Sequence, residues 1–566
     1  MMDWSRRNFL RRTGLAGAGA AVGGLSTMLD GCAITQRYDV VIRGGRVIDG
    51  TGAAAVAADI AIEGDRIVQI GPVQGSGRNT IDASGKIICP GFIDIHSHTD
   101  LSLLVDPRAE SKIRQGVTTE VAGQDGSSLA PLTDARLRSL QDGYGRRYGV
   151  DIGWRDFTGL FDTMEQQGIG LNFISLAGQG TIRGYVVGYE NVPASARQVD
   201  AMKDLVDQAM SEGAWGLSSG LEYTPGSFAG EDEIAELGRV AAGYSGFYAT
   251  HMRNEDDFLV EAVSEAISTA RKAEIALQIA HFKASGRRNR DKVAMCFDMI
   301  EQAVDEGMDI TLDRYPYIAY ATTLQNLFPT RFRAGGAEAF VSRLQSPDVL
   351  PAMKRAAVDK VDMLGDWSAV MITSVGRAEN QDYVGRRVSE IVARSGQDPF
   401  EFVRELLIAE NGGVGMVGFG MSEEEITSVL THPLVMVASD GGAAAVTGPL
   451  SETTPHPRYY GTFPRVLGKY CREEGLFGLP TAVHKMTGQP AMRLGLADRG
   501  RIDVGLVADL VVFDPDTVID RADFMNPHQY AQGIESVLVN GAVVIDGGEH
   551  TGALPGKVLR KQAGSA

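Results

Sequence analysis

The segment IICPGFIDIHSHTD, residues 87–100, begins as an apolar run and ends in two histidines that are separated by one residue. Side chains two positions apart on a strand point to the same face, so His96 and His98 are expected to project together from a strand end. Two convergent imidazoles can hold a divalent metal ion. A pair of surface histidines in a turn is the alternative, but the apolar run and the neighbouring Asp94 and Asp100 favour a metal site.

The composition is that of a large globular protein with an acidic net charge. The chain has 566 residues, of which 44% are hydrophobic and 22% charged, enough to bury a large core. Its 54 Lys and Arg against 72 Asp and Glu give a net charge of −18. This argues against a nucleic-acid partner, because phosphate binding needs basic patches. The four cysteines lie far apart and form no CxxC pair, so neither a disulfide framework nor a zinc ribbon is supported.

Residues 1–36 are expected to be an export segment rather than part of the fold. Ser5–Arg11 reads SRRNFLR, which matches the twin-arginine pattern, and a basic N-terminus arising by chance is the alternative. The apolar stretch 13–28 is too short and too rich in glycine for a membrane span. Cys32 ends a possible lipoprotein box, but Asp30 within it leaves lipidation open. We expect a periplasmic protein or a membrane-anchored lipoprotein.

Short β-strands are predicted at both ends of the chain. Gly44-Gly45 and Asn540-Gly541 are turn dipeptides flanked by apolar alternation, which is typical of hairpins. Together these strands predict a small β-sandwich built from residues 37–89 and 490–566. The predicted strands and hairpins are 38–49, 59–70, 507–514 and 537–546.

Between these ends, apolar strands alternate with helical stretches over residues 90–489. Repeated βα units of this length predict an α/β fold, a (β/α)8 TIM-like barrel with insertions. In such a barrel the functional groups lie at the carboxyl ends of the strands. The predicted strands are 118–122, 170–176, 213–218, 246–251, 275–281, 308–312 and 434–439, and the predicted helices are 195–212, 256–273 and 292–306.

Polar residues end several of these apolar runs. His251 and His281 close two neighbouring predicted strands, and Asp440 follows a later one. Taken singly, each could be an ordinary loop residue. With His96 and His98, however, four of the nine histidines and an aspartate stand at strand ends, so a barrel would bring them to one mouth.

These motifs together resemble the amidohydrolase superfamily, and within it the D-aminoacylase or N-acyl-D-amino-acid deacylase group. The resemblance covers residues 38–560, nearly all of the chain after the export segment. The matching motifs are PGFIDIHSH (90–98), GVTT (116–119), SLAP (128–131), GLSSGLEY (216–223), THMRNE (250–255), HFK (281–283), YPY (315–317), SDG (439–441), PHPR (455–458), GTFPRVL (461–467) and LPGK (554–557).

The resemblance implies a metal centre and a general base. The family's metal-binding histidines match His96, His98, His251 and His281, for one or two divalent ions, with zinc expected. Asp440 matches the aspartate that acts as general base and can touch the metal. As water attacks, Asp440 is expected to accept a proton and then to pass it to the leaving amine.

Three more residues match positions near the substrate. Tyr223 and Lys283 match residues close to the substrate carbonyl or carboxylate, and Arg458 matches an arginine that pairs with the substrate carboxylate. An arginine suits this role because its planar guanidinium can bind a carboxylate through two parallel hydrogen bonds.

The chain departs from the family's pattern in two places. Typical D-aminoacylases have a metal-binding cysteine in the loop after the second strand, and here Asp125 takes its place in GQDGSS, residues 123–128. A carboxylate is a harder ligand than a thiolate and could bridge two metals, or weaken one site and shift metal preference. The alternative is that Asp125 only caps a turn. The segment between Asp440 and Arg458 is also longer than usual, which puts the acyl or side-chain pocket in doubt.

The implied reaction is hydrolysis of N-acyl-D-amino acids by metal-activated water, giving a carboxylate and a D-amino acid. A bound divalent metal lowers the pKa of water to about 7. The preference for the D-enantiomer rests on the resemblance alone. The expected partner is a small N-acyl amino acid or a short peptide, and the oligomeric state is left open.

Two other classes of function stay open. One is another amidohydrolase, such as a dipeptidase for peptides with D-residues or a cyclic amidase. The carboxylated-lysine motif of cyclic amidases is missing from the sequence. The other is an exported binding protein without turnover, but such a protein has no need of a base such as Asp440.

Overall fold

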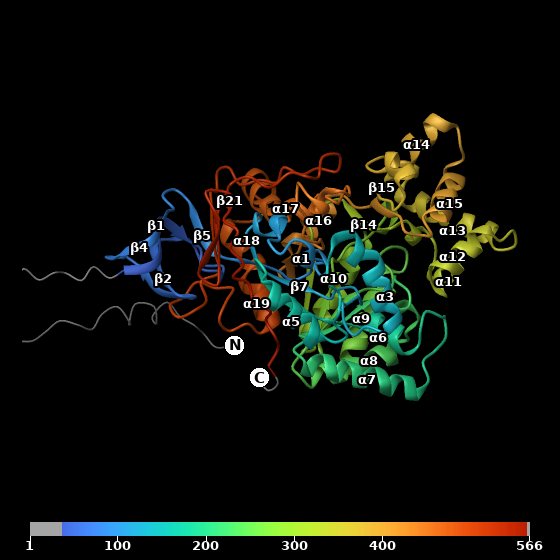
Figure 1. Cartoon of the computed structure of the whole chain (residues 1–566), viewed down its shortest axis with the longest axis horizontal. Coiled ribbons are helices and arrows are strands. Elements are labelled where there is room, and N and C mark those ends of the chain that lie inside the picture. The colour runs from blue at the N-terminus through green and yellow to red at the C-terminus, as the bar shows by residue number, and fades with distance from the viewer. Residues whose placement is uncertain (1–36, 563–566) are drawn as a thin grey trace, which may run out of the picture.

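The computed structural model describes residues 37–562, and the expected export segment at residues 1–36 lies outside them. Figure 1 shows the strands of the two chain ends together on one side of the molecule and an inserted subdomain on the other, with the barrel between them. Within residues 37–562, no helix combines the length and the apolar character needed to cross a membrane.

The two chain ends build one β-sheet that encloses its own core. Within residues 37–562 the sheet has nine strands in the order β21-β20-β19-β18-β5-β1-β2-β3, and β4 pairs with β1. The buried side chains of Ile42, Ile60, Ile88 and Leu510 belong to this core, so both ends of the chain contribute to it. The strands are β1 (Arg37–Val47), β2 (Val56–Glu63), β3 (Arg66–Gly71), β4 (Ser76–Asp82), β5 (Ile87–Pro90), β18 (Leu510–Phe513), β19 (Ile534–Val539), β20 (Ala542–Asp546) and β21 (Glu549–His550).

One predicted hairpin in this sheet is wrong. Residues 38–49 do not turn at Gly44-Gly45, because β1 continues to Val47 and pairs with β2 on both sides of a register shift between Ile42 and Gly45. Gly44 has φ +72°. The glycine pair therefore supplies a β-bulge, which uses the same positive φ as a tight turn. The hairpin at Asn540-Gly541 is confirmed, with φ +48° and +79° at these two residues.

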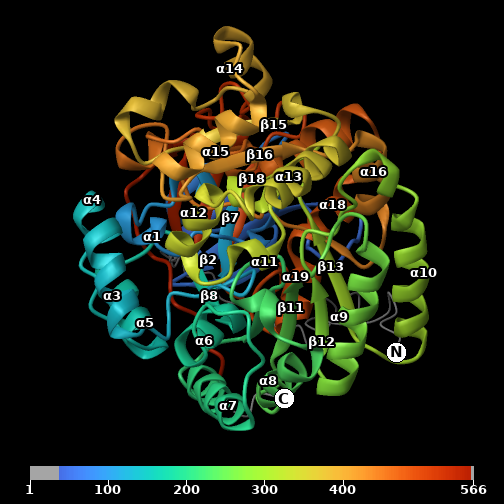
Figure 2. The same cartoon turned by 90° about the vertical axis from the view of Figure 1, so that its right-hand side faces the viewer.

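The middle of the chain forms the expected barrel. Within residues 37–562, eight parallel strands follow one another around the ring, and Figure 2 shows helices packed outside them. The ring closes through the amide of Trp215, which donates to the Ser175 carbonyl at 3.0 Å, and through a bridge between Ser97 and Gly441. The strands are β6 (Phe92–Asp94), β7 (Val117–Ala122), β8 (Asn172–Ser175), β10 (Gly216–Gly220), β11 (Phe247–His251), β12 (Ala276–Ile279), β13 (Ile310–Arg314) and β17 (Val435–Val437).

Local sequence explains where the outer helices begin and how they face the barrel. Helix α7 (Ala196–Ser211) starts after Ser195, whose hydroxyl accepts a hydrogen bond from the amide of Gln198 in a capping box. Its buried residues Met202, Val206 and Ala209 recur every three to four positions, so one apolar stripe packs inward. The other outer helices include α8 (Glu231–Ala242), α9 (Leu259–Ala273), α10 (Lys292–Asp305), α16 (Glu423–Thr431) and α18 (Leu479–Met486).

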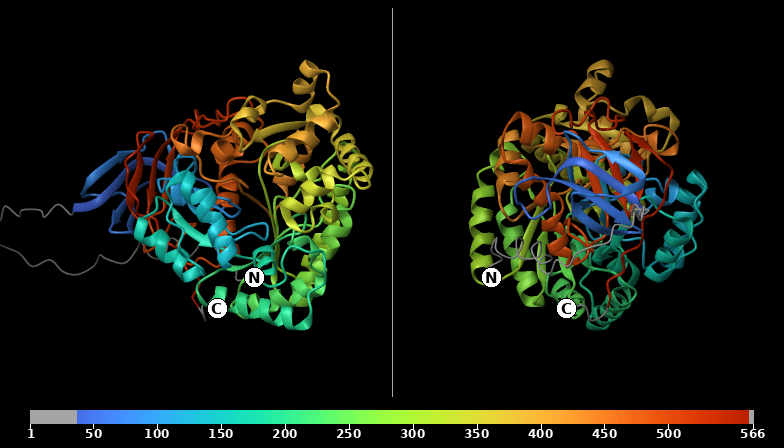
Figure 3. Two further views of the ribbon diagram at one scale, coloured as in Figure 1. Left: turned by 45° about the vertical axis from the view of Figure 1, so that its right-hand side comes forward. Right: turned by 90° about the vertical axis from the view of Figure 1, so that its left-hand side faces the viewer.

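An inserted subdomain interrupts the barrel between β13 and α16. Three antiparallel strands form its sheet, in the order β14-β16-β15, and its separate core includes Phe328, Phe340 and Val370. Figure 3 shows the insert at the end of the barrel away from the terminal sheet. The predicted domain limits at residues 89/90 and 489/490 stay predictions. The elements of the insert are β14 (Ala319–Thr323), α11 (Thr330–Arg333), α12 (Gly336–Gln345), α13 (Leu350–Leu364), β15 (Val370–Ser374), α14 (Val388–Ser395), α15 (Pro399–Ala409) and β16 (Gly415–Phe419).

Candidate metal centre

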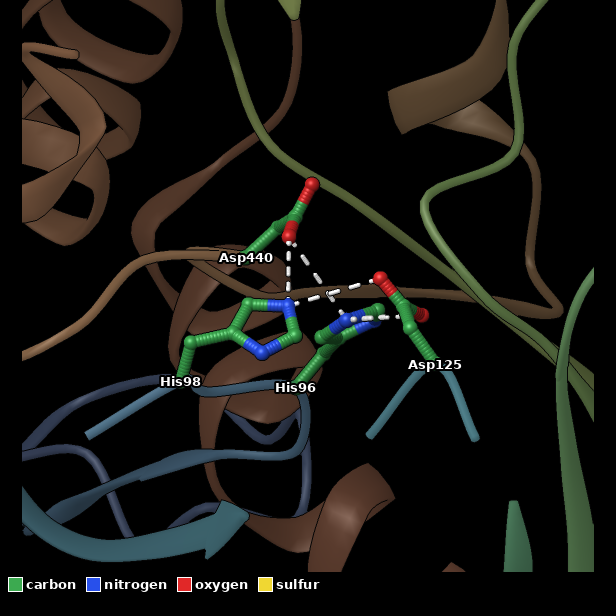
Figure 4. Close-up of side chains that lie close together, drawn as sticks. All are labelled: His96, His98, Asp125 and Asp440. Atoms are coloured by element: carbon green, nitrogen blue, oxygen red, sulfur yellow. Dashed lines mark hydrogen bonds and ion pairs between the residues drawn. The ribbon is translucent and has the colours of Figure 1, made fainter. Parts of the chain in front are cut away.

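The barrel brings the predicted metal ligands and the predicted base to one place. Each of them lies at or just after the carboxyl end of a strand, as the fold requires. Figure 4 shows four of these side chains, which point toward one another. The residues are His96 and His98 after β6, Asp125 after β7, His251 at the end of β11, His281 after β12 and Asp440 after β17.

Four residues form the first group: His96, His98, Asp125 and Asp440. His98 Nε2 lies 3.1 Å from Asp440 Oδ1 and 3.4 Å from Asp125 Oδ2. His96 Nε2 lies 3.4 Å from Asp125 Oδ1 and 3.6 Å from Asp440 Oδ1. Ligands bound at 2.0–2.2 Å to a tetrahedral ion are about 3.3–3.6 Å from one another, which is close to these separations.

A second group shares Asp125 with the first. His251 Nδ1 lies 2.9 Å from His281 Nε2. Asp125 Oδ2 is 3.7 Å from the first of these nitrogens and 3.6 Å from the second. One carboxylate therefore faces two pairs of histidines, which is the arrangement of a ligand that bridges two ions.

Unpaired buried atoms support a cation at this place. His96 Nε2 and Asp125 Oδ1 are both buried, and neither has a hydrogen-bond partner among residues 37–562. Leaving a buried polar atom unpaired costs about 1–3 kcal/mol, and a bound cation would satisfy both atoms. Imidazole and carboxylate donors suit zinc and other first-row divalent ions, so these residues fit one or two such ions.

The backbone is strained at three of the ligands. Asp125, His281 and Asp440 have φ of +53°, +33° and +49°, in a region that residues other than glycine rarely adopt. Gly220 supports the first of these turns, because a Cβ at this position would lie 2.0 Å from the Asp125 carbonyl oxygen. Such strain concentrates at functional sites, where the surrounding fold maintains it.

The three predicted substrate-binding residues line the same cavity as the metal ligands, and its volume is about 870 Å³. Arg458 begins helix α17 (Arg458–Arg465), and its Nη1 donates to Asp440 Oδ2 at 2.7 Å. The Tyr223 hydroxyl lies 3.3 Å from Thr322 Oγ1 in the insert. The Lys283 ammonium lies 2.5 Å from Glu255 Oε2 and 2.8 Å from His281 Nδ1.

The sequence pattern of the amidohydrolase family matches residues 79–545. The chain belongs to this family. This confirms the family expected from the motifs and the expected class, a metal-dependent hydrolase.

Known proteins that are similar to this chain agree with its assignment to the amidohydrolase family. A D-aminoacylase of Alcaligenes xylosoxydans xylosoxydans is 36% identical over 534 residues, which cover 94% of this chain and 99% of the relative. The crystal structure of N-acyl-D-glutamate deacylase from Bordetella bronchiseptica, with zinc and a phosphonate inhibitor, is 33% identical with a TM-score of 0.78 and covers 93% of this chain and 100% of that one. A D-aminoacylase structure with a binuclear metal centre is 35% identical with a TM-score of 0.77 and covers 92% and 100%. The expected barrel and sandwich are thereby confirmed.

Three further carboxylates lie behind the histidines of this amidohydrolase, each beside the imidazole nitrogen that faces away from the other ligand atoms. For His96 the contact is a hydrogen bond with Asp313, which can fix the tautomer and the ring orientation. The pairs are His96 Nδ1 with Asp313 Oδ1 at 3.2 Å, His281 Nδ1 with Glu255 Oε1 at 3.0 Å and His251 Nε2 with Glu222 Oε2 at 3.6 Å.

Sequence analysis missed these supporting carboxylates, although signals for them exist. Asp313 lies within β13 one residue before its end, so the strand-end rule that found the histidines applies to it. Glu255 follows His251 by four positions, and Glu222 precedes Tyr223 in the same motif, GLSSGLEY.

Metal binding to the amidohydrolase is expected to release at least two protons at pH 7.5, because a ligating nitrogen must be unprotonated. Burial opposes the charge of His98, but its hydrogen bonds to Asp125 and Asp440 outweigh this and raise its pKa to about 9. Burial opposes the charge of His251 too, but Glu255 and Asp125 raise its pKa to about 10. Below these values a proton competes with the metal, so affinity should rise with pH through this range.

Calorimetric titration of metal-free protein with zinc, in two buffers that differ in ionisation heat, measures the proton release. Affinity that stays constant or falls between pH 6 and 8.5, or binding without proton release, would contradict the expectation.

Proposed function

We propose that this amidohydrolase hydrolyses N-acyl-D-amino acids to a carboxylate and a D-amino acid. A D-aminoacylase and an N-acyl-D-glutamate deacylase, both similar over more than nine-tenths of the chain, support the substrate class and its D-configuration. The metal centre supports the reaction, since hydrolysis needs an activated water molecule and a base. A zinc ion, or two, is proposed as the cofactor.

The contact between Arg458 and Asp440 carries this proposal furthest. Arg458, whose guanidinium donates to Asp440, is 97% buried, and its Cζ lies 4.8 Å from the centre of the Tyr315 ring. The Nε of Arg458 has no hydrogen-bond partner among residues 37–562. A buried cation with a donor to spare, beside a hydrolytic centre, is suited to a substrate that carries a free carboxylate next to its amide.

The chain's own residues divide the work of the reaction. A divalent ion held by the histidines would lower the pKa of water to about 7 and polarise the amide carbonyl. Arg458 would hold the substrate carboxylate and so position the amide in the cavity. Burial raises the pKa of Asp440, but the charges of Arg458 and His281 outweigh it and hold the pKa well below its usual range. Asp440 is therefore ionised, and it can accept a proton and return it to the leaving nitrogen.

A panel of substrates tests the proposal on zinc-loaded protein. N-acetyl-D-amino acids, the matching L-enantiomers, D-dipeptides and hydantoins are compared under the same conditions. Faster hydrolysis of the N-acetyl-D-amino acids is expected. A preference for L-enantiomers or for hydantoins would reject the proposed function, and a preference for D-dipeptides would establish the alternative of a dipeptidase.

The role of Arg458 gives a prediction about the substrate rather than the protein. Replacing the α-carboxylate by a carboxamide should lower kcat/KM by about 10- to 150-fold, since one charge-assisted hydrogen bond contributes about 1.5–3 kcal/mol. In Arg458→Met, the ratio of kcat/KM for the carboxylate substrate to kcat/KM for the carboxamide substrate should fall toward one. A variant that keeps the full ratio would show that another group recognises the carboxylate.

We also propose export by the twin-arginine route, which gives a periplasmic protein or a membrane-anchored lipoprotein. The support is the SRRNFLR motif and the apolar stretch behind it, which lie outside the described residues. Lysine at both Arg6 and Arg7 should retain the protein in the cytoplasm on cell fractionation. If Cys32 carries a lipid, Cys32→Ser should move the protein from the membrane fraction to the soluble fraction. An unchanged distribution would show that Cys32 carries no anchor.

A further inference from the structure

The cavity lining is mixed, but one part of it gathers apolar side chains. Lys283, Arg458 and Asp440 follow strands β12 and β17. Several apolar residues of the lining lie in the segments after β7, β8 and β10, which also contribute the charged Arg136 and Glu222. We call Leu132, Tyr185, Tyr189 and Pro225 the apolar lobe.

The order of strands places this lobe across the metal centre from Arg458. Around the eight-strand ring, β10 lies four positions from β17 in either direction, and β8 is its neighbour. Tyr185 and Tyr189 follow β8, and Pro225 follows β10. A substrate whose carboxylate is held by Arg458 and whose amide lies at the metal ligands therefore directs its acyl group toward the lobe.

The side chains of the two tyrosines in the apolar lobe are nearly half exposed to solvent. Tyr185 is 43% and Tyr189 47% exposed, among the few large apolar side chains of residues 37–562 that remain in solvent. Their aromatic faces offer apolar contact area, while the hydroxyl ends can stay in water. The Gly335 amide of the insert donates to the Tyr189 carbonyl at 2.8 Å, so this residue is fixed in place at the mouth.

We propose that the apolar lobe binds a long aliphatic or arylacetyl acyl group, so that the enzyme prefers such substrates to N-acetyl ones. The inference rests on the proposed function for the orientation of the substrate. The size of the cavity agrees with it, because about 870 Å³ lies near the upper end of the range for drug-sized ligands, and an N-acetyl amino acid is much smaller.

Gly184 offers a way to fill the lobe without disturbing the backbone. It lies in helix α6 (Gln179–Val186), and a Cβ built there would be 3.6 Å from both Tyr189 Cζ and Pro225 Cγ. This is ordinary van der Waals contact, so a larger side chain at this position extends into the lobe. Gly184→Leu is therefore the informative variant, with Tyr189→Ala as a second one and the exposed, non-lining Phe258→Ala as the matched control.

The experiment compares kcat/KM for N-acetyl, N-octanoyl, N-phenylacetyl and N-succinyl derivatives of one D-amino acid. We expect kcat/KM for the octanoyl and phenylacetyl derivatives to exceed that for the acetyl derivative at least tenfold. This is less than complete burial of the added methylenes would give. The octanoyl-to-acetyl ratio should fall at least tenfold in Gly184→Leu, fall in Tyr189→Ala and stay at the wild-type value in Phe258→Ala. A preference for acetyl or succinyl, or an unchanged ratio in Gly184→Leu, would overturn the inference.

Calorimetric binding of octanoate and acetate to the zinc-loaded protein separates this inference from the proposed function. Octanoate should bind at least tenfold tighter than acetate, and the difference should disappear in Gly184→Leu. If no N-acyl-D-amino acid is hydrolysed but this difference is found, the lobe is supported and the proposed reaction is rejected. Equal binding of the two carboxylates overturns the lobe.

Discussion

Asp440→Asn is expected to lower kcat by about 10³- to 10⁴-fold, the upper part of the range for general acid–base catalysis. The asparagine has the same shape and keeps one oxygen for the contact with His98 Nε2, 3.1 Å away in the wild type. It lacks the charge that accepts a proton and that pairs with Arg458. Because His96, His98 and Asp125 remain, the metal content should change little, and KM should change less than kcat.

Metal analysis and steady-state kinetics on the same preparation check this result. Asp520→Asn is a matched control, because Asp520 also pairs with an arginine of α17, Arg465, at 3.0 Å, but does not line the catalytic cavity. The control should keep near wild-type turnover. Hydrolysis at the wild-type rate in Asp440→Asn would exclude this carboxylate as the base, and loss of metal together with activity would make it primarily a ligand.

The metal centre was predictable because strand direction carries most of the information. A parallel barrel collects the residues that end its strands, so His96, His251, His281 and Asp440 could be assigned to one place from apolar runs alone. No distance between them had to be known. Asp125 was found only through the resemblance, because its predicted strand ends at residue 122, whereas the predicted strand 434–439 runs directly into Asp440.

Other features could not be read from local patterns. Gly44-Gly45 has the composition of a hairpin turn, and only the pairing of β1 with strands on both of its edges decides for a bulge. The strand-end rule applies to the supporting carboxylate Asp313, but it does not tell a residue that binds the metal from one that lies behind a histidine. The apolar lobe combines segments after three strands, and its members have no common sequence signal.

Asp125→Asn is expected to cause the largest loss of metal among single substitutions at this centre. Asp125 contacts the ligand nitrogens of all four histidines at 3.4–3.7 Å, so it belongs to both candidate sites. The negative charge of the Asp125 carboxylate partly neutralises a bound divalent ion, and the neutral amide of asparagine cannot. Asparagine is the suitable change, because it tolerates the φ of +53° at this position, whereas alanine would add backbone strain of about 1–2 kcal/mol.

We expect Asp125→Asn to keep less than half of the wild-type zinc after dialysis against a chelator, with turnover per protein reduced at least in proportion to the zinc lost. Asp125→Cys should restore zinc binding and disfavour manganese, because a thiolate is a softer ligand than a carboxylate. Asp134→Ala removes an exposed carboxylate from the same part of the chain and should change neither property. Thermal unfolding of each variant separates loss of metal from loss of fold. If Asp125→Asn retains its zinc and its turnover, Asp125 only shapes the turn between Gly123 and Gly126, and the two pairs of histidines share no ligand.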